Sequence, residues 1–89
     1  MATALPTPPA SLRLTAAAAV RLLRVVYLDT CNGRPVATIS ATRTPLTRLV
    51  RDERTFRDYN VLTPAALEYR AALVAAGALP ALSPAFAAI

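Results

Sequence analysis

The dipeptide Asn32-Gly33 constrains the fold of this chain more than any other feature of the sequence. It lies between two runs of residues that favour strands, Arg24–Thr30 and Pro35–Ala41. Asn and Gly both tolerate positive φ angles, and this pair between such runs is the strongest short-range signal of a β-hairpin. We therefore expect a hairpin over about residues 21–41.

The register of this hairpin decides which side chains it buries. If Gly33 is left-handed in a three-residue loop, Thr30 pairs with Arg34 and Leu28 pairs with Val36. Because side chains alternate between the two faces of a strand, this register fixes the composition of each face. It predicts one buried face made of Tyr27, Val25, Ala37 and Ile39.

The same stretch follows a recurring pattern of a hydrophobic residue, Asp, two or three turn residues, Gly, any residue, Pro and a small apolar residue. Here the pattern reads Leu28-Asp29-Thr30-Cys31-Asn32-Gly33-Arg34-Pro35-Val36-Ala37. It resembles a strand–turn–strand segment of transthyretin-like and carboxypeptidase-regulatory-like β-sandwich domains. The resemblance implies turn geometry and no activity, because the hydrolase branch of the transthyretin-like family relies on histidines and this chain has none.

Two Thr-Pro dipeptides predict helix starts, since Thr caps a helix and Pro suits its first position. After Thr44, a short helix is expected over about residues 45–58, where three ion pairs fall at i, i+4 spacing. Those pairs are Arg48 with Asp52, Glu53 with Arg57, and Arg54 with Asp58.

After Thr63, a second helix is expected over about residues 64–76, and Gly77 supplies a left-handed stop. Residues 12–20 fit either a helix or a strand, and from about residue 21 the strand is favoured. The predicted fold class is therefore a small single α+β domain with one hairpin and two short helices.

Prolines near both ends predict extended arms around this domain. We expect an arm over residues 1–11, the α+β domain over residues 12–77 and an apolar tail over residues 78–89. The tail either docks into a groove of a partner protein or folds over its own small core. The residues predicted to contact a partner are Pro6, Pro8, Pro9, Leu79, Leu82, Phe86 and Ile89.

The composition argues against most catalytic chemistry. The chain has no histidine and one cysteine, so it lacks the ligands of a structural zinc site and the base of a Ser–His–Asp or Cys–His nucleophile. Asp52 and Glu53 would point about 100° apart on a helix, which does not suit paired acid–base work. We therefore expect no enzyme activity, no catalytic residue, no cofactor and no metal, and the absence of a long apolar run predicts no transmembrane segment.

The charge is carried entirely by arginine on the basic side, with ten arginines against five acids and a formal net charge of +5. Arginine suits bidentate contacts with carboxylates or phosphates, although GC-rich codon usage would enrich arginine as well. Both explanations stay open. The arginines predicted to make contacts with other subunits or with phosphate are Arg13, Arg21, Arg24, Arg48, Arg51, Arg54 and Arg57.

A small core points to a partner. Twenty of the 89 residues are alanine, so the number of large apolar side chains is low for a free-standing domain. We expect a non-enzymatic structural or accessory subunit of a large protein assembly, for which a symmetric arrangement is one option. Within that class the prediction is a minor or decoration-type bacteriophage virion protein that docks through its terminal arms. The alternatives are a small basic nucleic-acid-associated protein, as second choice, and a protein-binding inhibitor, with a cytoplasmic location as the alternative to the virion.

Overall fold

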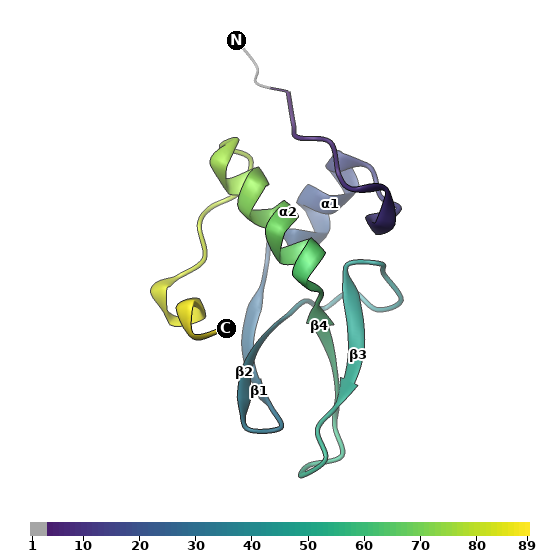
Figure 1. Ribbon diagram of the computed structural model, residues 1–89, viewed down its shortest axis with the longest axis vertical. Coiled ribbons are helices and arrows are strands. Elements are labelled where there is room, and N and C mark those ends of the chain that lie inside the picture. The colour runs from purple at the N-terminus through teal and green to yellow at the C-terminus, as the bar shows by residue number, and fades with distance from the viewer. Residues whose placement is uncertain (1–3) are drawn as a thin grey trace.

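The computed structural model describes residues 4–89 and contains a four-stranded antiparallel sheet and two α-helices (Figure 1). This confirms the predicted α+β class. The strands lie in the order β1-β2-β4-β3 across the sheet. Along the chain the elements are the 3-10 helix η1 (Ala10–Leu12), α1 (Ala16–Leu23), β1 (Tyr27–Cys31), β2 (Arg34–Thr38), β3 (Thr47–Arg51), β4 (Asp58–Leu62), α2 (Pro64–Ala75) and the 3-10 helix η2 (Pro84–Ala88).

Strands β1 and β2 form the predicted hairpin, but with a tighter turn than expected. Asn32 and Gly33 have φ angles of 52° and 75°, so both central residues of a two-residue turn are left-handed. This is the turn whose twist matches that of a hairpin best. It pairs Cys31 with Arg34 and Leu28 with Ala37, and the predicted register was therefore wrong by one residue.

The register shift changes which residues the hairpin buries. Ala37 and Ile39 lie in the core as predicted. Tyr27 and Val25, which were expected beside them, are 48% and 57% exposed. Tyr27 pairs with Thr38 and so lies on the face opposite Ala37, because neighbouring residues of a strand point to opposite faces.

The predicted helix over residues 45–58 is wrong, because these residues form β3, a loop and the start of β4. None of the three predicted i, i+4 ion pairs is formed; instead Arg51 Nε lies 3.3 Å from Asp58 Oδ1, its cross-strand partner. Such surface pairs contribute only a few tenths of a kcal/mol to a helix. The burial of Leu46 and the loop at Asp52 therefore prevail over that local preference.

Both helices begin at threonine caps. The Oγ1 atoms of Thr15 and Thr63 accept hydrogen bonds from the backbone N–H groups three residues later. Helix α2 confirms the second predicted helix and ends as expected at left-handed Gly77, where the N–H groups of residues 77 and 78 bond back to Val74 and Leu73. Of residues 12–20, which fit either a helix or a strand, those from residue 16 onward belong to helix α1. The strand favoured from about residue 21 begins only at Tyr27, because residues 21–23 still belong to α1.

The core lies where the two helices meet the bases of the hairpins. A buried arginine joins the helices: Arg70 Nε donates to the backbone oxygen of Leu23 at 3.1 Å and so satisfies the C-terminal end of α1. Burial lowers the pKa of Arg70 from its usual value. The buried apolar residues are Leu12, Ala19, Leu23, Ala37, Ile39, Leu46, Leu62, Ala66, Tyr69, Leu73 and Leu79.

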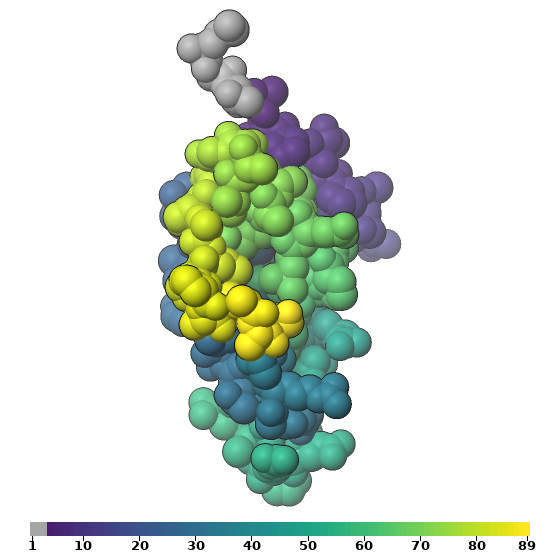
Figure 2. Space-filling model, turned by 60° about the vertical axis from the view of Figure 1, so that its left-hand side comes forward, coloured from purple at the N-terminus to yellow at the C-terminus, as the bar shows by residue number. Residues whose placement is uncertain are grey.

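The two segments expected to be arms make contacts within the chain. The hydroxyl of Tyr69 donates to the backbone oxygen of Pro6 at 2.7 Å. Residues 84–88, expected to be extended, form η2, which lies beside β2; Figure 2 shows this C-terminal segment in yellow against α2 and the β1–β2 hairpin. The boundaries of the predicted arms stay a prediction.

The two hairpins point away from the helices (Figure 1). Each hairpin pairs over five residues, whereas β2 and β4 share only the bridge between Thr38 and Val61. The molecule is elongated, with principal extents of 49 × 27 × 17 Å.

Candidate partner-binding groove

A groove of about 570 Å³ lies between the two hairpins. Three arginines, three valines and one acidic residue line it, drawn from β2, β3, β4 and the β3–β4 loop. We call this site the arginine groove. Its lining residues are Cys31, Asn32, Arg34, Val36, Arg48, Val50, Glu53, Arg54 and Val61.

Strand register brings the arginines of the groove to its two ends. Arg34 pairs with Cys31 next to the β1–β2 turn, and Arg48 pairs with Val61, the bridge residue at the other end. Arg54 comes from the β3–β4 loop and crosses the β1–β2 turn. A Cβ atom at Gly33 would lie only 3.3 Å from the Nη2 atom of Arg54, so the guanidinium lies close against this turn.

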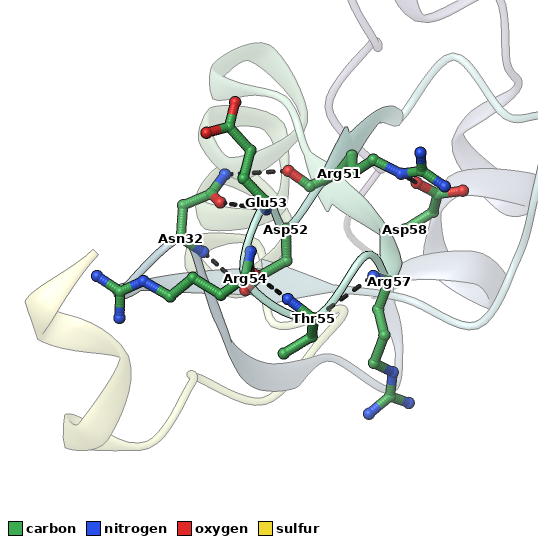
Figure 3. A network of polar contacts seen from close by, with 8 residues as sticks. All are labelled: Asn32, Arg51, Asp52, Glu53, Arg54, Thr55, Arg57 and Asp58. Carbon is green, nitrogen blue, oxygen red and sulfur yellow. Dashed lines mark hydrogen bonds and ion pairs between the residues drawn. The ribbon is translucent and has the colours of Figure 1, made fainter.

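The tips of the hairpins are joined by a cluster of hydrogen bonds that we call the clasp, formed by Asn32, Asp52 and the backbone of residues 51–53 (Figure 3). The backbone N–H of Asn32 donates to Asp52 Oδ2 at 2.9 Å. The side chain of Asn32 donates through Nδ2 to the oxygen of residue 51 and accepts at Oδ1 from the N–H of residue 53. The clasp therefore closes the end of the groove opposite the Thr38–Val61 bridge.

Asp52 also shapes the β3–β4 loop. Its buried carboxylate accepts hydrogen bonds at Oδ1 from the N–H groups of Arg54 and Thr55, at 2.7 and 3.1 Å. The hydrogen bonds from Asn32 first, and then those from Arg54 and Thr55, lower the pKa of Asp52 below its usual value. The ionised carboxylate thus holds the loop and the clasp together.

The charge of the groove is predominantly positive. Among its lining residues Glu53 is the single acid, against Arg34, Arg48 and Arg54. Asp29, on the neighbouring strand, accepts a hydrogen bond from the hydroxyl of Thr38 at 2.6 Å. Burial, and then the charge of Asp52, raise the pKa of the Cys31 thiol, which disfavours a reactive thiolate.

Two of the seven arginines predicted from the sequence line the groove, and the other five lie outside it. Arg48 and Arg54 line it, whereas Arg51 pairs with Asp58 and the guanidinium of Arg57 lies 5.9 Å from the centre of the Tyr59 ring. The remaining three are exposed elsewhere: Arg13 after η1, Arg21 in α1 and Arg24 at its end.

Arg34 was missed as a site residue. Its position directly after the Asn-Gly turn was a usable signal, because the residue after such a turn is paired in the ladder and its face is therefore fixed. Recognising its neighbours in the groove required the position of the second hairpin, which no local pattern supplies.

The residues predicted to contact a partner through the arms are divided between the core and the surface. Leu79 is buried and Phe86 packs partly against the core, so both contribute to this chain's own interior. Pro9 and Ile89 are exposed, whereas Pro6, Pro8 and Leu82 are half-buried. Their predicted role in partner binding stays a prediction.

Phe56 is an exposed aromatic residue at the tip of the β3–β4 loop. Its side chain is 71% exposed, and its φ angle of 59° is left-handed. Two backbone hydrogen bonds of 2.8 Å fix this conformation, from Phe56 N–H to the Asp52 oxygen and from Asp52 N–H to the Arg57 oxygen. An exposed phenylalanine in a left-handed conformation costs stability, which points to a role outside folding.

Replacing Phe56 with asparagine should therefore raise the free energy of unfolding by about 0.5–1 kcal/mol, because asparagine tolerates the left-handed region. Urea denaturation measures this change. Phe56→Leu is the matched control and should show no gain, since leucine keeps the unfavourable backbone conformation. A loss of stability in Phe56→Asn would mean that the aromatic ring supports the fold.

Within residues 4–89, no helix is long and apolar enough to cross a membrane. The same residues contain no group of three or more His, Cys, Asp or Glu side chains that could hold a metal ion.

Comparison with known proteins gives this chain no relatives: no protein-family model, curated protein or solved structure matches it.

Proposed function

We propose that this protein is a non-enzymatic accessory subunit that binds an acidic surface of another protein through the arginine groove. The observation that carries the proposal is the convergence of Arg34, Arg48 and Arg54 on a groove that contains one acid. Arginine is enriched at protein interfaces and pairs with carboxylates in a bidentate geometry. The groove therefore combines charge with a defined shape.

The exposed loop tip next to the groove supports the proposal. Phe56 and Arg54 belong to the same hydrogen-bonded loop and are two positions apart in the sequence. Aromatic and arginine side chains contribute much of the binding energy at many interfaces. A rigid loop loses little conformational freedom when a partner binds.

Nucleic-acid binding, the second choice from the sequence, fits the groove less well. Proteins that follow a single strand offer a continuous basic channel with aromatic side chains on which bases stack. The arginine groove lies between the Thr38–Val61 bridge and the clasp, and no aromatic residue is among those that line it. Binding of a protein surface is therefore the better explanation of its chemistry.

The sequence predicts that the assembly is a virion and that the terminal arms help to dock the subunit. Both ideas stay predictions. The arginine groove gives the subunit a docking site that does not depend on either arm.

Site-specific photo-crosslinking tests the proposed function. Glu53, which lines the groove without being one of its three arginines, is replaced by p-benzoylphenylalanine in the full chain. The protein is expressed in the cells that naturally make it, and the adducts are identified by mass spectrometry. We expect one discrete protein adduct, which should disappear when Arg34 and Arg54 are both changed to glutamate.

The matched control carries the same photo-reactive group at Arg21, which is exposed on α1 and outside the groove. It should give no such adduct. Crosslinks to nucleic acid, the same adducts from both positions, or no adduct at position 53 would each overturn the proposal.

A further inference from the structure

We infer that the arginine groove binds a short, extended acidic segment of its protein partner, with one apolar side chain seated between two carboxylates. This inference rests on the proposed function and specifies the chemistry of the occupant. The carboxylates lie two residues before and two residues after the apolar residue. The spacing follows from the order of side chains along the groove.

The middle of the groove is apolar. Val36 and Val50 lie there, each two positions along its strand from the bridge end, and Val61 lies at that end opposite Arg48. All three valines are only half-buried in the chain alone. Valine side chains cannot bind a carboxylate, and covering them with an apolar group removes hydrophobic surface from water. The occupant is therefore expected to present an apolar side chain at this place.

The ends of the groove are basic. Arg34 and Arg54 lie beside the clasp, whereas Arg48 lies beside the Thr38–Val61 bridge. Exposed ion pairs are weak in water, but they strengthen when a partner covers them. Two carboxylates, one for each end, would complete the charge pairing while the apolar residue excludes water from the centre.

The length of the groove selects an extended segment of about five residues. Alternate residues of an extended chain point to the same side, and four residue steps span about 13 Å. Arg34 and Thr38 are also four steps apart along β2, which runs beside the groove. Acidic residues at positions −2 and +2 around an apolar residue therefore match the two basic ends.

A protein segment fits this site better than a small metabolite. Sites for small molecules enclose their ligand and fix it with a few buried polar groups. Here Arg34, Arg48 and Arg54 are all exposed, and within residues 4–89 no buried side-chain N or O atom lacks a hydrogen-bond partner. An extended peptide segment, which can lie along an open groove, therefore suits these exposed arginines better than an enclosed small molecule.

NMR titration of the full chain with blocked heptapeptides tests the inference. The probe is Ser-Glu-Ser-Leu-Ser-Glu-Ser, which carries the predicted spacing. A second peptide, Ser-Ser-Glu-Leu-Glu-Ser-Ser, has the same composition but places its glutamates next to the leucine. A third replaces the leucine of the probe with serine, and a dT12 oligonucleotide tests nucleic acid.

We expect the probe to shift the amide signals of Val36, Arg48 and Arg54, and to bind about tenfold more tightly than either of the other peptides. Arg48→Glu should weaken binding of the probe about tenfold. Arg21→Glu changes the net charge equally at a site outside the groove and should leave the affinity within about twofold. Both variants should keep the thermal midpoint of the unchanged chain.

Equal affinities for the three peptides would overturn the inference, and so would shifts outside the groove or no binding. Stronger binding of dT12 at the same signals would assign the groove to nucleic acid instead. The crosslinking experiment above distinguishes failure of this inference from failure of the proposed function. A protein adduct at position 53 without peptide binding would reject the acidic segment and retain the proposed function.

Discussion

Replacing Asp52 with alanine should lower the thermal midpoint of the protein by about 10 °C or more, because three backbone N–H groups lose their acceptor at once. These groups belong to Asn32, Arg54 and Thr55, and they lie on both hairpins. Differential scanning calorimetry measures the midpoint. A shift of less than about 2 °C would show that the clasp contributes little to the fold.

Asp52→Asn is more informative, because it distinguishes the bonds within the β3–β4 loop from the bond to Asn32 in the clasp. An asparagine Oδ1 can still accept from the N–H groups of Arg54 and Thr55. Its Nδ2 would face the N–H of Asn32, so that two donors would oppose each other. We therefore expect the β3–β4 loop to persist while the clasp opens, with loss of peptide binding in the arginine groove.

The same carboxylate predicts a pH dependence. Since the pKa of Asp52 is lower in the folded than in the unfolded chain, its contribution to stability is complete above the unfolded value of about 3.9 and is lost as the pH falls through the folded value. The urea concentration at the midpoint of unfolding should therefore decrease when the pH is lowered below about 4. This decrease should be smaller in Asp52→Asn than in the unchanged protein. Parallel pH profiles for the two proteins would contradict this assignment.

Leu73→Ala should lower the free energy of unfolding by about 2–5 kcal/mol, the range for a leucine removed from a packed core. Leu73 is fully buried in α2, among residues of both helices and the sheet. A small domain has little stability in reserve, so this variant is expected to be partly unfolded at 37 °C. Urea denaturation at 10 °C measures the change.

Leu49→Ala is the matched control for this prediction. Leu49 lies in β3 and is 65% exposed, so its removal should change the free energy of unfolding by less than about 0.5 kcal/mol. Similar losses in the two variants would mean that β3 is covered in solution, for example by a second copy of the chain.

Local signals predicted the elements that depend on a few neighbouring residues. Asn32-Gly33 forms its turn, Thr63 caps α2 and Gly77 ends it, because each acts through its own backbone angles or a hydrogen bond within the first turn. The hairpin register was missed by one residue, since the sequence does not state whether Asn32 joins Gly33 in the left-handed region. That choice exchanged the two faces of β1.

The segment from residue 45 to 58 shows where local reasoning fails. Its charges satisfy helical spacing, yet it also contains residues that favour strands and, at Asp52, a turn. The contacts that decide between these options come from far along the chain. Asn32 bonds to Asp52 across 20 residues, and the N–H of Thr63 bonds to the oxygen of Leu46.

The sequence by itself determined an α+β chain with one hairpin, one capped helix and an excess of arginine. The arginine groove was decided only by the tertiary structure. Its three arginines, Arg34, Arg48 and Arg54, are distributed over 21 positions of the sequence. They line one groove because β2 pairs with β4 at one bridge while the clasp joins the hairpin tips. Local preferences act over about one turn of chain, whereas a binding groove depends on how separate hairpins pack against one core.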